Sequence, residues 1–192
     1  QQQGKLDKVE YIQIVFLRIY LLENCRHLPI LVTNEKWWLD EKIQEVGQYH
    51  CPFLFDIFSD LLQEVEPLRR KYIHKILPID AWHMIQEFSF DFIFYLERIA
   101  KKSIEIFIHT EVFQQIQFGN QVKIYVGEYM NENHLIYQSR LENRSKEESE
   151  VLLKKICDRK EEELCLQNLS QLTLNHMDLK GSDFRFSDLS YS

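Results

Sequence analysis

The C-terminal part of the 192-residue chain, residues 164–192, reads LCLQNLSQLTLNHMDLKGSDFRFSDLSYS. A large apolar residue occupies every fifth position of this stretch. These positions are Leu164, Leu169, Leu174, Leu179, Phe184 and Leu189. A spacing of five matches neither the 3.6-residue period of an α-helix nor the two-residue period of a β-strand. The stretch therefore predicts a short repeated unit rather than a plain helix or strand.

The residues before the large apolar positions define the unit further. The positions directly before the last five of them are Asn168, Thr173, Asp178, Asp183 and Asp188. The cleanest units are Ser182-Asp183-Phe184 and Ser187-Asp188-Leu189, in which a small residue and an aspartate precede the apolar residue. These units resemble the pentapeptide-repeat family, in which four units form one square coil of a right-handed β-helix.

The resemblance covers residues 164–192 alone, and it implies that the six apolar residues form the core of the coil. Gln167, Leu172 and Met177 stand where the family has a small residue, as expected for atypical terminal repeats. Five units make slightly more than one coil and cannot form an independent core. We therefore expect that the natural protein continues or that this segment packs on the rest of the chain. The alternative interpretation is a loop and short helix with accidental spacing.

The remainder of the chain carries helical signals. With 5 Gly and 4 Pro, the composition argues against a loop-rich all-β protein and favours long helices. We expect a mainly α fold, in which residues 1–160 form a helical domain with a small β-hairpin near 121–141. The start of a right-handed quadrilateral β-helix is expected to follow over 164–192.

Four helical segments are expected before the hairpin. Residues 6–24 place Val9, Ile12 and Phe16 at helical spacing, and a second helix is expected from about residue 34 to Gly47. Helices over 53–66 and from Asp80 toward residue 102 follow, bounded by prolines. Because residues 88–94 alternate apolar and polar, a strand is the alternative there.

The hairpin and the last helix have local signals of their own. Val122, Ile124 and Val126 alternate with polar residues, which is typical of a strand. Ser145 followed by Glu148 forms a capping box, so we expect a helix over 146–160.

Charge and cysteine content bound the function. A net charge of −7 disfavours binding to a nucleic-acid backbone. The most apolar runs, 11–22 and 88–96, are shorter than the ~20 residues that span a bilayer, so no membrane association is expected. The four cysteines are scattered and no export signal precedes them, which predicts reduced thiols in a cytoplasmic protein.

The sequence contains no Gly-rich phosphate loop and no G-x-S-x-G or H-E-x-x-H motif, so we expect no enzymatic activity and no cofactor. No histidine or cysteine pair has zinc spacing, and no metal is expected.

Arg69 and His74 match the R-x4-H spacing of the HEPN nucleases, in which the arginine holds phosphate and the histidine assists RNA cleavage. A solvated helix face explains the same residues.

The helical domain is rich in aromatic residues that fit two interpretations, an apolar ligand cavity between helices or ordinary core packing. They are Phe53, Phe55, Phe58, Phe88, Phe90, Phe92, Phe94 and Tyr95.

The leading hypothesis is a non-enzymatic regulatory or scaffolding protein of bacterial type that binds a protein partner through the helical domain and the repeat segment. The alternatives are a helical sensor for a small apolar ligand and a HEPN-like ribonuclease that uses Arg69 and His74. The sequence assigns no oligomeric state.

Overall fold

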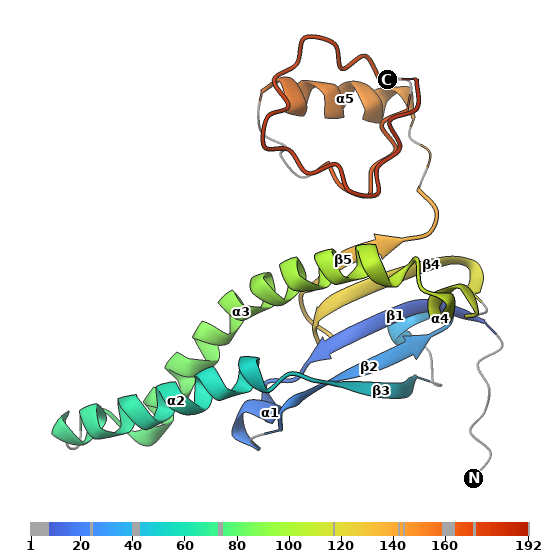
Figure 1. The fold of residues 1–192 in the computed structure, drawn as a ribbon. Coiled ribbons are helices and arrows are strands. Elements are labelled where there is room, and N and C mark those ends of the chain that lie inside the picture. The colour runs from blue at the N-terminus through green and yellow to red at the C-terminus, as the bar shows by residue number, and fades with distance from the viewer. Residues whose placement is uncertain are drawn as a thin grey trace. The chain divides into compact units, whose positions relative to one another are not determined.

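The computed structural model describes residues 8–191 except 24, 40–42, 73–74, 117, 142, 144, 159–163 and 171. The chain forms two compact units, Gln1–Ile136 and Tyr137–Ser192. Figure 1 shows a sheet with long helices in the first unit, and one helix with an irregular segment in the second.

A five-stranded mixed sheet is the framework of the first unit. Its strands are β1 (Val9–Phe16), β2 (His27–Thr33), β3 (Gln44–His50), β4 (Phe118–Glu128) and β5 (Asn133–Gln138). The strand order is β3-β2-β1-β4-β5. β1 pairs antiparallel with β2 and parallel with β4, and β2 pairs antiparallel with β3. Strand β1 therefore lies at the centre of the sheet.

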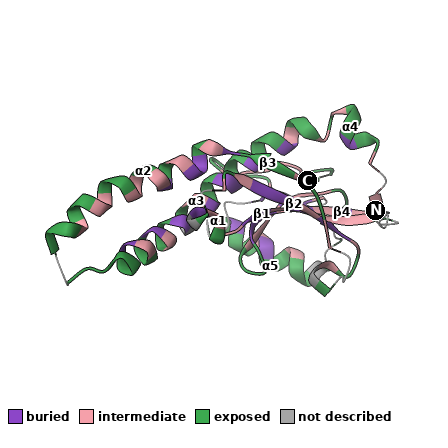
Figure 2. Cartoon of the chain, turned by 90° about the horizontal axis from the view of Figure 1, so that it is seen from below, coloured by how far each residue is buried: buried purple, intermediate pink, exposed green. Residues whose placement is uncertain are grey.

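The helices of this unit lie mostly between β3 and β4 in sequence. They are α1 (Ile19–Leu22), η1 (Trp37–Leu39), α2 (Pro52–Arg69), η2 (Arg70–Tyr72), α3 (Pro78–Phe107) and α4 (Glu111–Gln114). Figures 1 and 2 show α2 and α3 side by side as a hairpin whose tip extends away from the strands. The Asp80 carboxylate accepts a hydrogen bond of 2.7 Å from the Leu77 N–H and so caps the start of α3.

The expectation of a mainly α fold is wrong, because the first unit is built on an open mixed sheet. Residues 9–16, expected in a helix, form the central strand β1. β1 carries apolar residues on both faces, Ile12 and Ile14 on one and Tyr11 and Val15 on the other, so Val9, Ile12 and Phe16 match a helical spacing by coincidence. The helix expected from about residue 34 to Gly47 is also wrong, since those residues form η1 and β3.

The expectations for the two long helices are confirmed. The helix over 53–66 is α2, and Pro67 lies inside it, two residues before its end at Arg69. Residues 88–94 belong to α3 and not to a strand. Ile85, Ser89 and Ile93 are buried at intervals of four, which is the spacing of one helix face.

The strands β4 and β5 form the hairpin expected near 121–141 and meet closely at Gly127. A Cβ at Gly127 would lie 2.2 Å from the Glu132 carbonyl oxygen and 2.9 Å from the Asn133 Oδ1. The missing side chain also gives Gln13 on β1 access to Asn133, to which its side-chain amide donates a hydrogen bond. Gly127 is thus required by space rather than by its backbone angles.

The second unit begins its helical part with α5 (Lys146–Cys157). The Ser145 hydroxyl accepts a hydrogen bond of 3.2 Å from the Glu148 N–H, and the Glu148 carboxylate accepts one of 2.8 Å from the Ser145 N–H. The capping box predicted from sequence is therefore confirmed, with the helix ending three residues earlier than expected, at Cys157.

The expected β-helix is not formed, and this part of the fold prediction is wrong. In the described residues from 164 onward the structure contains turns and one isolated parallel bridge, between Asn168 and Asp188, but no strand. Hydrogen bonds from the Leu164 and Leu169 N–H groups to the Asp183 and Asp188 carbonyls join the two ends of the segment. One passage of the chain offers no neighbouring coil on which continuous strand ladders could form.

The repeated apolar residues pack against α5. The cluster contains Leu152 and Ile156 of α5 with Leu164, Leu169 and Leu172, all buried. Leu174, Leu179 and Phe184 are partly buried and pack against this cluster, whereas Leu189 stays exposed. The five-residue spacing thus supplies the small core of the second unit together with the helix.

Candidate functional site: an apolar groove between the sheet and α3

The groove is floored by rows of aliphatic side chains on one face of the sheet. In the strand register, Ile12 lies between Val32 on β2 and Ile124 on β4. Ile14 lies opposite Ile30 in the next row of the same face. Register partners share a face, and alternate residues of a strand return to it, so these side chains form a continuous apolar floor.

The roof comes from the last turns of α3. Ala100, Ser103, Ile104 and Phe107 follow the i, i+3, i+4, i+7 spacing of one helix face, and all four line the groove. Two of the four side chains are small. Because Ala100 and Ser103 do not fill the space above the isoleucine rows, a cavity of about 490 Å³ remains there.

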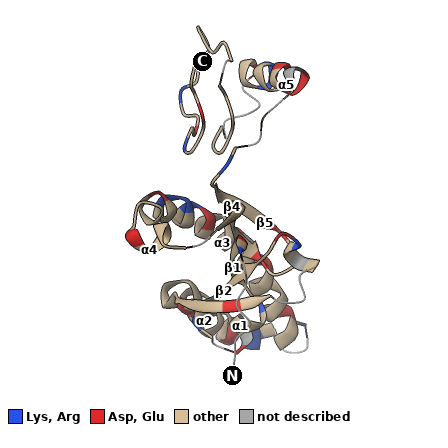
Figure 3. Cartoon of the chain, turned by 90° about the vertical axis from the view of Figure 1, so that its right-hand side faces the viewer, with Lys and Arg blue, Asp and Glu red and all other residues tan. Residues whose placement is uncertain are grey.

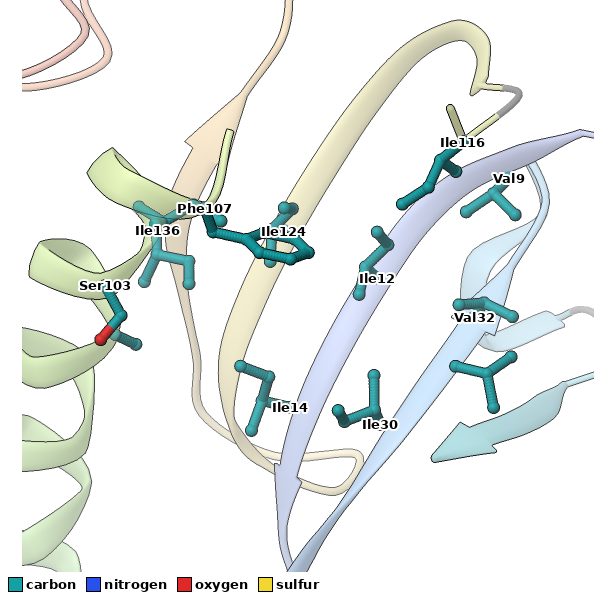
Figure 4. Close-up of a pocket in the computed structure, with 13 residues that line it drawn as sticks. Val9, Ile12, Ile14, Ile30, Val32, Ser103, Phe107, Ile116, Ile124 and Ile136 are labelled. Carbon is teal, nitrogen blue, oxygen red and sulfur yellow. The ribbon is translucent and has the colours of Figure 1, made fainter. Parts of the chain in front are cut away.

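The groove is closed at one end and open at the other. Ile124 and Ile136 are almost completely buried, whereas Val46 on β3 and Phe107 on α3 are exposed. Figure 4 shows side chains from the strands and from α3 directed into the common space. We infer that a ligand enters beside the exposed Val46 and reaches the buried end beneath α3, where Phe107 lies beside Ile124 (Figure 4).

The lining is almost entirely apolar. Among the described residues that line the groove, Ser103 alone has a polar side chain. The Ser103 hydroxyl donates a hydrogen bond of 2.9 Å to the Ile99 carbonyl of its own helix. A polar ligand group inside the groove would lose its bonds to water with no replacement, which costs about 1–3 kcal/mol. The groove therefore suits a ligand whose enclosed part is apolar.

A buried polar cluster joins α3 to β5 near the groove. The Lys101 ammonium lies 2.6 Å from the Glu97 carboxylate, whose other oxygen is 3.3 Å from the His134 Nδ1. The Phe94 ring lies against His134, with 5.6 Å between ring centroids. Glu97 and Lys101 are both buried and bind each other, so we interpret the cluster as an attachment of the helix to the strand.

Of Arg69 and His74, the catalytic alternative from the sequence, the structure describes Arg69 alone. The Arg69 guanidinium donates to both carboxylate oxygens of Glu66, at 2.8 and 2.6 Å. These hydrogen bonds lower the pKa of Glu66 to about 2, and the Arg69 pKa is raised. His74 lies outside the described residues.

The aromatic residues proposed from sequence as cavity walls lie elsewhere. None of the eight whose side chains the structure describes is among the residues that line the groove. Phe58 packs on Phe92 with 4.7 Å between ring centroids, and Phe55 stacks on Phe16 at 6.1 Å. These contacts belong to the packing of α2 on its neighbours.

Sequence reasoning missed the aliphatic residues that do line the groove. Their signal was the alternation Ile12–Ile14 and Ile30–Val32, which indicates strands with one common apolar face.

Cys51 is fully buried, and burial raises the pKa of its thiol to about 11, so it is a protonated core residue at neutral pH.

Comparison of the chain with models of known protein families, with curated proteins and with solved structures found no match. Among the helices in the described part of the chain, none combines the length and the apolar character needed to cross a membrane.

Proposed function

We propose that the first unit binds a small apolar ligand in the groove between the sheet and α3, as a sensor or carrier rather than an enzyme. The observation that carries the proposal is the cavity of about 490 Å³. Its described lining contains a single hydroxyl, that of Ser103, which already donates a hydrogen bond to the Ile99 carbonyl. This volume falls within the range of about 300–1,000 Å³ that small-molecule sites occupy.

The chemistry of the lining supports a hydrocarbon-like ligand. Aliphatic side chains offer dispersion contacts and the release of water from apolar surface, at about 25 cal/mol for each Å² buried. They offer no means of polarising a bond or moving a proton. A ligand with an apolar chain and a polar end would place the chain under α3 and the polar end at the mouth, near Val46.

The regulatory or scaffolding role expected from the sequence is compatible with ligand binding. In this proposal the second unit, with its resemblance to pentapeptide repeats over 164–192, supplies contact with a protein partner. The groove and the second unit involve different residues, so each role is open to a separate test.

The test is a titration with phenylnaphthylamine, an uncharged fluorophore whose emission rises in apolar surroundings, followed by displacement with decanol. The Val46→Asp variant puts a charge at the mouth of the groove. Val112→Asp is the matched control, because Val112 is similarly exposed but lies on α4, outside the described lining.

We expect saturable binding to the wild-type protein and to Val112→Asp, and binding at least about ten-fold weaker to Val46→Asp, since a charge at an apolar site costs more than about 1.4 kcal/mol. Equal binding to all three proteins, with unchanged unfolding transitions, would contradict the proposal.

A further inference from the structure

The outward face of α3 carries an apolar stripe that has no packing partner in the described part of the chain. Met84, Phe88, Tyr95, Ile99 and Ile106 are between 43% and 75% exposed. At 100° per residue they all fall within about 60° of one another around the helix axis. Figure 2 shows exposed residues along α3 beside the buried positions that face its neighbours.

The stripe is distinct from the face that lines the groove. The groove is contacted by Ala100, Ser103, Ile104 and Phe107, none of which belongs to the stripe. A single exposed apolar residue is normal on a protein surface, but five in one line over most of a 30-residue helix indicate an interface.

Charged residues accompany the stripe in a directional order. Glu87 and Asp91 come first, and Arg98 and Lys102 follow, all four exposed. The structure gives none of them an ion-pair partner among the residues that it describes. Figure 3 shows charged positions of both signs on the helices of the first unit. From residue 87 to residue 102 the exposed charges of this flank thus change from acidic to basic, and Glu105, of intermediate exposure, follows them.

We propose that the α3 stripe is the interface for a second copy of this chain, with the two α3 helices antiparallel around a two-fold axis between Phe94 and Tyr95. In an antiparallel pair each flank meets the same flank of the other copy. Glu87 then faces Lys102 of the second copy, and Asp91 faces its Arg98. The symmetry forms each pair twice.

The charge order selects this occupant and this orientation. A parallel pair would instead bring this flank against the opposite flank of the second copy, so the four charges would not face one another. The antiparallel pair turns the same four residues into four attractive contacts that flank an apolar centre at Tyr95. An isologous contact of this kind closes with two copies and leaves no free interface.

The area is sufficient for a reversible dimer. A large side chain offers about 150–200 Å² when fully exposed, so five that are about half exposed supply roughly 400–500 Å² in each copy. Two copies and their flanking charges together bury about 1,000 Å² or slightly more, at the lower end for specific interfaces. We therefore expect association in the micromolar range.

The experiment is sedimentation velocity of the full chain from about 1 to about 100 μM, the range in which an interface of this size dissociates. Asp91→Arg places two arginines opposite each other at both symmetric positions. The double variant Asp91→Arg with Arg98→Asp exchanges the charges and restores the attraction. Asp60→Arg, an exposed position on α2, is the control with the same change in net charge.

We expect wild type and Asp60→Arg to dimerise alike, Asp91→Arg to dimerise at least about ten-fold more weakly, and the double variant to return to within about three-fold of wild type. Thermal unfolding checks that all variants are folded. A wild-type protein that stays monomeric throughout, or a dimer that the double variant does not restore, overturns the proposal. Neither result bears on ligand binding, because the groove uses other residues.

Discussion

Ile12 on β1 and Ile124 on β4 are direct register partners in the parallel pairing of the two strands, and both line the groove beneath α3. The two residues are 112 positions apart in the sequence. Their juxtaposition depends on the crossover that contains β2, β3, α2 and α3. The groove is therefore a product of the whole first unit and not of any local motif.

Filling the groove from its roof should block ligand binding. In Ser103→Phe the ring occupies the space that the small side chain leaves open, and phenylnaphthylamine binding should weaken by at least about ten-fold. Ser103→Ala is the control, since it removes the hydroxyl and keeps the space. Strong binding to Ser103→Phe would show that the fluorophore binds elsewhere.

Gly127 should tolerate no side chain. Gly127→Ala brings a Cβ within 2.2 Å of the Glu132 carbonyl and should lower the free energy of unfolding by about 1–3 kcal/mol. Gly47→Ala is the matched control, because nothing lies within 4 Å of a Cβ there. Urea unfolding of both variants measures the difference. Equal effects at the two positions would mean that β4 and β5 approach less closely than described.

Removing one partner of the buried ion pair should be costly. Glu97→Ala removes the buried carboxylate that binds the Lys101 ammonium and contacts His134, and it should lower the free energy of unfolding by about 3 kcal/mol. Asp56→Ala breaks an exposed pair with Arg26 and should cost less than about 1 kcal/mol. If chemical unfolding gives similar values for both, the attachment of α3 to β5 does not depend on this pair.

Cys51 should make stability fall in alkaline solution. Burial raises the pKa of its thiol from 9.0 to about 11, so the unfolded chain ionises at lower pH than the folded one. The contribution is complete below about pH 9 and is lost as the pH rises through about 11; at pH ~10.5 the loss is about 2 kcal/mol. Unfolding curves at pH ~8 and ~10.5 measure it.

The control for this prediction is Cys51→Ala, which lacks the ionisable group and should show a smaller alkaline decline than wild type. A thiol-labelling reagent offers a second readout. Cys25, Cys157 and Cys165 have accessible surface and should react in the folded protein, whereas Cys51 should react only on unfolding. Rapid labelling of Cys51 under native conditions would contradict its burial.

The helices were predictable because their signals are local. Pro52 and Pro78 occupy first-turn positions in α2 and α3, and Ser145 with Glu148 caps α5. β1 was not predictable in the same way. It carries apolar residues on both faces, so its pattern lacks a clean alternation, and its central place in the sheet depends on pairing with β4, which is far away in sequence.

From the sequence we proposed an apolar type of ligand but not the place where it binds. Apolar binding was an alternative hypothesis based on aromatic residues, but Phe58 and Phe92 pack on each other, and the groove is aliphatic. Its location depends on strand register and on two small residues of α3, Ala100 and Ser103. Neither the register nor the position of the helix over the sheet is contained in a short stretch of sequence.

The most direct test of the account is a methyl NMR titration of the protein, labelled at isoleucine, with decanol. Isoleucines line the groove at positions 12, 14, 30, 104, 116, 124 and 136, whereas Ile57, Ile79 and Ile156 lie outside its described lining. We predict saturable shifts confined to the first group. Shifts at Ile57, Ile79 or Ile156 in place of the groove residues, or no saturable shifts at all, would contradict ligand binding in this groove.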